Sequence, residues 1–107
     1  MLAISTTKEI IQNIGKIFEK GLQNEYLSRS IGKISEYEKE NTIKEINMLK
    51  KELSRFESAY QMSSEDFFDR FEKGDLGDKE DYFEWSAIYQ MYERSVDRLN
   101  ILESPSV

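Results

Sequence analysis

The stretch from Ile46 to Gly74, INMLKKELSRFESAYQMSSEDFFDRFEKG, decides the fold. Its first part repeats apolar side chains in alternating steps of three and four residues, at Ile46, Leu49, Leu53, Phe56 and Tyr60. Such a heptad repeat is typical of a helix that packs one face against another helix. This stretch therefore predicts an all-α architecture.

A new helix is predicted to begin at Ser63. The Ser63 hydroxyl can accept a hydrogen bond from the backbone N–H of Asp66, whose side chain can reach back to Ser63. Met62 and Phe67 occupy the two staple positions of this capping box. The helix ends before Gly74, because glycine tolerates the left-handed conformation of a helix C-terminus.

The last helix follows a tight connection over 74–78, and Asp78 with Asp81 repeats the capping pattern. Its apolar residues form a second heptad seam of aromatic character, at Tyr82, Trp85, Tyr89, Tyr92, Val96 and Leu99. The two seams are expected to pack together, within one chain or across a dimer, and to bury Trp85. Phe68, in the preceding helix, and Phe83 each lie off the seam defined by their neighbours.

Two helices are predicted before this region. Thr6 with Glu9 fits a capping box, and apolar residues then repeat at helical spacing at Ile10, Ile11, Ile14, Ile17 and Phe18. The next helix, over 25–61, would be ~54 Å long, whereas a compact chain of this size has a radius of gyration of ~13 Å. Either it breaks, for which Thr42 with Glu45 offers a cap, or it protrudes and finds a partner. A continuous helix is favoured.

The predicted fold is all-α, with helices near 6–20, 25–61, 64–73 and 79–102. It comprises a long helix, two shorter helices and an aromatic C-terminal helix, in a helical hairpin or bundle completed by oligomerisation. Residues 1–103 are expected to form one domain, and residues 104–107 a frayed tail.

The charge of the chain is −6, and most of it lies in one half. Residues 63–107 carry five basic and twelve acidic side chains, a balance of −7, whereas residues 1–62 have a balance of +1. An acidic surface is unsuited to nucleic acid and suits a basic protein partner. The alternative is that these charges only keep a small domain soluble.

The composition excludes several kinds of chemical site. The chain has no cysteine and no histidine, so disulfides, thiolate nucleophiles and the usual zinc sites are excluded. Residues 1–4 read MLAI without a basic segment, and no apolar run approaches the ~18 residues of a membrane span. We therefore expect a cytoplasmic protein without a membrane partner.

No catalytic, cofactor or metal site is predicted. A calcium loop counted from Asp75 meets Gly77 and Lys79 where oxygen ligands are needed. An alternative function is a magnesium-dependent nucleotide pyrophosphatase, which uses pairs of carboxylates on two helices. The nearest matches are the pairs Asp81 with Glu84 and Glu93 with Asp97, the second of which has the wrong spacing. A structural helical adaptor is a further alternative.

The candidate binding surface combines the acidic residues around the last connection with an aromatic side chain. An aromatic residue surrounded by charges is a typical anchor for a protein partner. We expect this surface to comprise Asp75, Asp78, Glu80, Asp81, Phe83 and Glu84.

Residues 49–102 resemble a family of small prokaryotic helical proteins. The resemblance is carried by FESAYQMSSEDF at 56–67, GDLGD at 74–78 and DYFEW at 81–85. Some members of this family resemble the antitoxins of toxin–antitoxin modules. The resemblance therefore implies a non-enzymatic binding protein that neutralises a basic toxin. No ribbon-helix-helix or helix-turn-helix pattern accompanies it.

Overall fold

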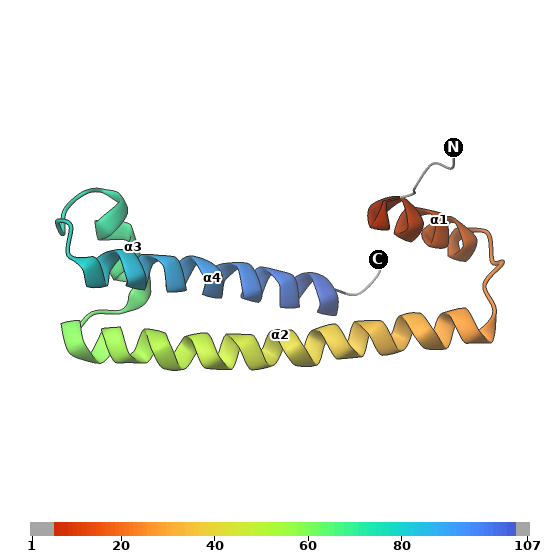
Figure 1. Cartoon of the computed structure of the whole chain (residues 1–107), viewed down its shortest axis with the longest axis horizontal. Coiled ribbons are helices and arrows are strands. Elements are labelled where there is room, and N and C mark those ends of the chain that lie inside the picture. The colour runs from red at the N-terminus through yellow and green to blue at the C-terminus, as the bar shows by residue number, and fades with distance from the viewer. Residues whose placement is uncertain (1–5, 105–107) are drawn as a thin grey trace. The chain divides into compact units, whose positions relative to one another are not determined.

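The chain folds into α-helices. A computed structural model describes residues 6–104, which form α1 (Thr7–Glu19), α2 (Glu25–Tyr60), α3 (Ser64–Glu72) and α4 (Glu80–Glu103), with no strand among them (Figure 1). The all-α prediction is confirmed, and each predicted helix boundary lies within one residue of the observed one. Of the predicted frayed tail, 105–107 lie outside the described residues. The chain divides into two compact units, residues 1–34 and 35–107.

Helix α2 is continuous from Glu25 to Tyr60. Thr42, where a break was the alternative, is buried inside the helix, and its hydroxyl donates a hydrogen bond to the Glu38 carbonyl oxygen at 2.7 Å. Because this hydroxyl is satisfied within its own helix, Thr42 does not act as a cap. The helix is capped instead by Asn24, the residue before Glu25, whose Oδ1 accepts a hydrogen bond from the backbone N–H of Leu27 at 2.8 Å.

Helix α3 begins and ends where the capping residues of the sequence predict. Ser63 Oγ accepts a hydrogen bond from the Asp66 backbone N–H at 3.1 Å, as predicted, whereas the Asp66 carboxylate lies 3.3 Å from Arg70. After the helix, Gly74 adopts φ +78°, and the Asp75 N–H reaches the Arg70 carbonyl oxygen at 3.0 Å. This is the hydrogen-bond pattern of a Schellman motif, which requires the left-handed conformation at Gly74.

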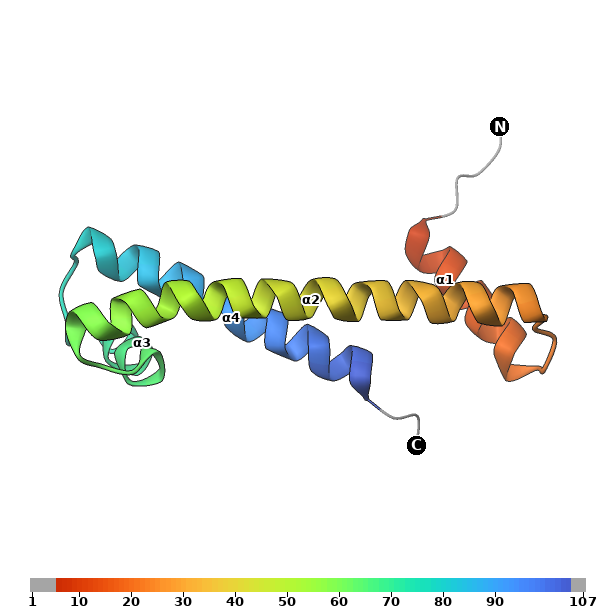
Figure 2. The same cartoon turned by 90° about the horizontal axis from the view of Figure 1, so that it is seen from below.

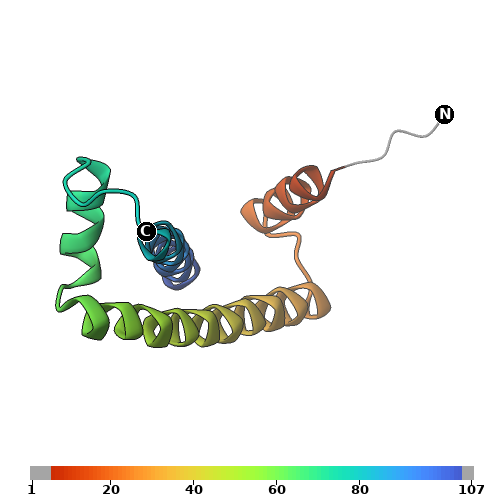
Figure 3. The ribbon, with the colours of Figure 1, turned by 60° about the vertical axis from the view of Figure 1, so that its left-hand side comes forward.

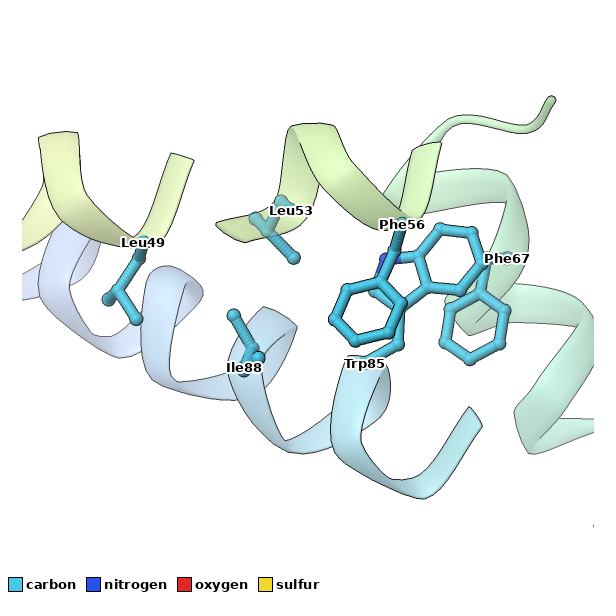
Figure 4. Packing of buried hydrophobic residues seen from close by; sticks show 6 residues of the cluster. All are labelled: Leu49, Leu53, Phe56, Phe67, Trp85 and Ile88. Atoms are coloured by element: carbon cyan, nitrogen blue, oxygen red, sulfur yellow. The ribbon is translucent and has the colours of Figure 1, made fainter. Parts of the chain in front are cut away.

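The core of the second unit is built by three helices. Helix α4 runs antiparallel to the C-terminal half of α2 and crosses it obliquely (Figure 2), while α3 stands across the end of α2 (Figure 3). The buried cluster comprises Leu49, Leu53 and Phe56 from α2, Phe67 from α3, and Trp85 and Ile88 from α4 (Figure 4). The two seams therefore pack together within one chain.

Trp85 is buried where the helices meet, as predicted. Its side chain is 0% exposed, and its indole stacks on the Phe67 ring with 3.8 Å between the ring centroids. The Phe56 ring also stacks on the indole, with 5.6 Å between the ring centroids. The indole Nε1 donates a hydrogen bond to Ser64 Oγ at 2.9 Å.

The buried face of α4 is wider than the predicted seam. Ile88 and Ser95 are buried although neither belongs to the seam, whereas Tyr89 is half-buried and its ring lies 5.1 Å from that of Phe68. The reason is that α4 packs against both α2 and α3, and a helix with two neighbours buries more than a coiled-coil stripe.

Within residues 6–104, no helix is long and apolar enough to cross a membrane. In the first unit, α1 contains no buried residue.

Candidate functional site

The connection between α3 and α4 presents the predicted acidic residues. Gly74 and Gly77 adopt backbone φ values of +78° and +85°. Residues that have a Cβ rarely adopt such values. These two positions turn the chain within a few residues and leave Asp75 and Asp78 exposed between the helices. The two glycines of the GDLGD pattern therefore determine where the carboxylates of Asp75 and Asp78 lie.

The predicted cap at Asp78 is wrong. Helix α4 begins one residue later than expected, at Glu80, and its N-cap is Lys79, which makes no side-chain capping hydrogen bond. The Lys79 ammonium lies over the rings of Tyr60 and Tyr82, 5.6 Å and 5.7 Å from their centroids. These cation–π contacts hold Lys79 at the start of the helix. Asp78 consequently precedes the cap.

Asp81 joins α4 to the end of α2. Its carboxylate accepts a hydrogen bond from the Tyr60 hydroxyl at 2.7 Å. This hydrogen bond, together with burial and the negative charge of Asp81, raises the pKa of Tyr60. The partner of Asp81 was not foreseen, because Tyr60 is 21 residues away and the sequence assigned it only to the apolar seam.

Asp81 and Glu84 line an open cleft between α2 and α4. Its other lining residues belong to the last turns of α2 and are Ser54, Arg55, Phe56, Ser58, Ala59 and Tyr60. One wall of the cleft is therefore acidic, and the opposite wall carries aromatic and small side chains together with the basic Arg55. No signal within either helix could have predicted this pairing, since it depends on how α4 lies against α2.

Phe83 projects from a different side of α4. It lies two residues after Asp81, which corresponds to about 200° around a helix. Its ring is 57% exposed and stands edge-on to Phe71 of α3, with 5.4 Å between the centroids and 87° between the planes. Phe71 in turn stacks on the buried Phe67 at 5.4 Å. The exposed Phe83 ring is thus in contact with the buried core through Phe71.

All six predicted residues are exposed, but they do not form one patch. Asp75 and Asp78 lie in the connection, Asp81 and Glu84 line the cleft beside α2, and Phe83 lies against α3. We call the residues of this region the acidic end, meaning Asp75, Asp78, Glu80, Asp81, Phe83 and Glu84.

Comparison with protein-family models, curated proteins and solved structures finds no match for this chain.

The carboxylate pairs considered for magnesium both lie on α4. Asp81 and Glu93 are twelve residues apart, which is ~18 Å along a helix axis. The pyrophosphatase pattern requires pairs that face each other from two helices, so these two pairs cannot meet within one chain. Among residues 6–104, no group of three or more carboxylates is placed to hold a metal ion.

Proposed function

We propose that this chain is a non-enzymatic, cytoplasmic protein-binding module, an antitoxin-like protein whose acidic end holds a basic protein partner. The observation that carries this proposal is the exposed ring of Phe83, which Phe71 holds against the core. A ring that is already ordered loses little conformational entropy on binding, and aromatic anchors supply much of the binding energy at interfaces.

The charge around this ring supports a basic partner. Glu80 is exposed and precedes Phe83 by three residues, so the two lie on the same side of α4, within the half of the chain that has a balance of −7. Complementary charges mainly accelerate association, and their effect weakens as salt screens them over ~8 Å at physiological ionic strength. The resemblance to antitoxin-like proteins makes a small toxin the class of partner that we expect.

The test separates the aromatic contribution from the electrostatic one. The product of the adjacent gene is co-expressed with the chain, and association and dissociation rates are measured at several salt concentrations. We expect Phe83→Ala to accelerate dissociation by roughly thirtyfold, as for a residue worth about 2 kcal/mol at an interface. Glu80→Gln with Glu84→Gln should instead slow association and flatten its salt dependence.

Matched controls lie at the other end of α4. Ile101 is also exposed, and Glu103 is an exposed carboxylate, so Ile101→Ala and Glu103→Gln should leave both rates unchanged. If the variants of the acidic end remain folded and bind as the parent does, the site is wrong. Magnesium-dependent hydrolysis of nucleoside triphosphates by the purified chain would refute the non-enzymatic assignment.

We also infer that the chain forms a homo-oligomer. Helix α2 has 36 residues, but its buried residues all lie between Thr42 and Phe56. Its first seventeen residues bury no side chain, although they carry apolar residues at helical spacing. A second copy of the chain would supply the missing contacts.

A further inference from the structure

The cleft between α2 and α4 joins an apolar surface to two negative charges. It has a volume of about 670 Å³ and lies between the last turns of α2 and the first turns of α4. Phe56, which is 9% exposed, and Ala59 supply apolar surface. Asp81 and Glu84 supply the carboxylates. This combination suits a ligand that has a cationic head on an apolar stem.

The cleft is open to a ligand wherever the first unit lies. Arg55, in one wall, comes 30 residues after the start of α2 at Glu25, which is ~45 Å along the helix axis. The connection over 20–24 and the 13 residues of α1 together reach at most ~40 Å from Glu25. Helix α1 therefore cannot cover the cleft.

The two carboxylates of the cleft lie on one side of α4 and form no ion pair. They are three residues apart, so they project from adjacent turns. Among residues 6–104, five carboxylates form ion pairs, and neither Asp81 nor Glu84 is one of them. The Tyr60 hydroxyl donates a hydrogen bond to Asp81 Oδ2 at 2.7 Å, which orients this carboxylate and leaves its other oxygen for a ligand.

A guanidinium group fits such a pair of carboxylates better than an ammonium group does. It is planar and carries five N–H donors, so it can bridge two carboxylates, whereas an ammonium is a compact point charge. Hydrogen bonds from guanidinium to carboxylate are charge-assisted and therefore strong. The methylene stem of an arginine can lie on the apolar surface of Phe56 and Ala59.

Arg55 gives the cleft a property by which the ligand charge can be tested. It is exposed in the wall opposite Asp81 and Glu84, and it forms an ion pair with neither of them within the described residues. The charge of the lining is therefore −1. Removing Arg55 should strengthen the binding of a cation, and removing either carboxylate should weaken it. For an anionic ligand both effects would be reversed.

We propose that this cleft is a binding site for a guanidinium group, which the basic protein partner supplies as an arginine side chain. The source of the arginine rests on the proposed function, whereas the guanidinium site rests on the cleft itself. Because Phe83 lies on a different side of α4, the ring and the cleft hold the partner at two separate points.

The first test uses the full chain without a partner. The isotope-labelled protein is titrated with n-butylguanidinium and, as a matched control, with n-butylurea, which has the same shape and no charge. Nuclear magnetic resonance follows the amide chemical shifts of residues 54–60 and 81–84. We expect saturable shifts with a Kd on the order of millimolar for n-butylguanidinium, as for a small ligand held by a few contacts, and none for n-butylurea.

Variants of the lining residues show whether the cleft is responsible. Asp81→Asn and Glu84→Gln should each weaken the binding of n-butylguanidinium by roughly fivefold, the effect of an exposed ion pair, and Arg55→Gln should tighten it by roughly twofold. Glu93→Gln, which changes an exposed carboxylate of α4 outside the cleft, should leave it unchanged. Circular dichroism checks that each variant is folded. Absence of saturable binding, equal binding of n-butylurea, or weaker binding by Arg55→Gln overturns the site.

The second test identifies the source of the guanidinium group. In the complex with the product of the adjacent gene, Asp81→Asn should accelerate dissociation by roughly fivefold, and Arg55→Gln should slow it. If both variants dissociate as the parent does, the arginine of the partner is overturned although the proposed function stands. If n-butylguanidinium binds and the gene product does not, the proposed function and the source fail together, and the guanidinium site stands.

Discussion

At the scale of single residues, Trp85 connects three helices. Its ring lies between those of Phe67 and Phe56, and its Nε1 donates to Ser64 Oγ at 2.9 Å. The Ser64 backbone N–H in turn donates to the Glu57 carboxylate at 2.9 Å. The buried polar groups around the indole are therefore satisfied, as burial requires.

Replacing Trp85 by Ala should lower the free energy of unfolding by roughly 3–5 kcal/mol, because a large buried ring leaves a cavity. Ser64→Ala should cost less, roughly 1–3 kcal/mol, since it leaves only the indole N–H without a partner. Urea unfolding followed by circular dichroism measures both values. Fluorescence of the folded parent should be that of an indole shielded from water, and emission typical of an exposed indole would contradict the assigned burial.

The Tyr60–Asp81 hydrogen bond predicts a change in tyrosine titration. The hydrogen bond to Asp81 is the largest cause of the raised pKa of Tyr60, so Asp81→Asn should lower this pKa toward the ordinary value of 10.0. Absorbance titration measures the change, and Tyr60→Phe identifies which of the six tyrosines is responsible. Asp75→Asn is the control, because Asp75 lies in the connection and the hydrogen bond is made by Asp81.

The same pKa determines how stability depends on pH. Because the folded-state pKa of Tyr60 is raised, its protonated hydroxyl contributes stability that is complete below pH 10 and is lost as the pH rises through the folded-state pKa. The parent should therefore lose stability above pH 10 more steeply than Asp81→Asn does. Identical pH dependence in the two proteins would show that the hydrogen bond is not formed in solution.

At the scale of the elements, the two N-caps should differ in their effect on stability. Ser63 caps α3, which contributes Phe67 to the core, and Thr6 caps α1, which buries no residue. Ser63→Ala should therefore lower the free energy of unfolding of the second unit by about 1 kcal/mol. Thr6→Ala should leave it unchanged, because α1 contributes nothing to that core.

Urea unfolding followed by Trp85 fluorescence measures this difference, since the tryptophan reports only on the second unit. Equal losses in the two variants would mean that α1 and the core unfold as one cooperative structure.

At the scale of the whole molecule, the second unit should fold without the first. Its buried cluster, from Leu49 to Ile88, lies entirely within residues 35–107. A fragment of residues 35–107 should therefore keep the fluorescence and near-ultraviolet circular dichroism of Trp85. Loss of the near-ultraviolet signal would show that residues 1–34 are needed for the core.

The sequence by itself determined the helices and their ends. The Ser63 cap and the left-handed Gly74 depend on hydrogen bonds between residues at most five positions apart, so their signals are contained in short segments. The heptad steps likewise identified Leu49, Leu53, Phe56 and Trp85 as core residues, because the period of a helix places them on one face.

Only the tertiary structure decided how these helices meet and which charged residues lie together. It pairs Asp81 with Tyr60 across 21 residues, buries Ile88 beside the seam, places Lys79 over two rings where Asp78 was expected to cap, and separates Phe83 from the cleft. These features depend on the angle and depth at which α4 packs between α2 and α3. That geometry results from the fit of all the contacting side chains at once, and the spacing of residues along one helix does not contain it.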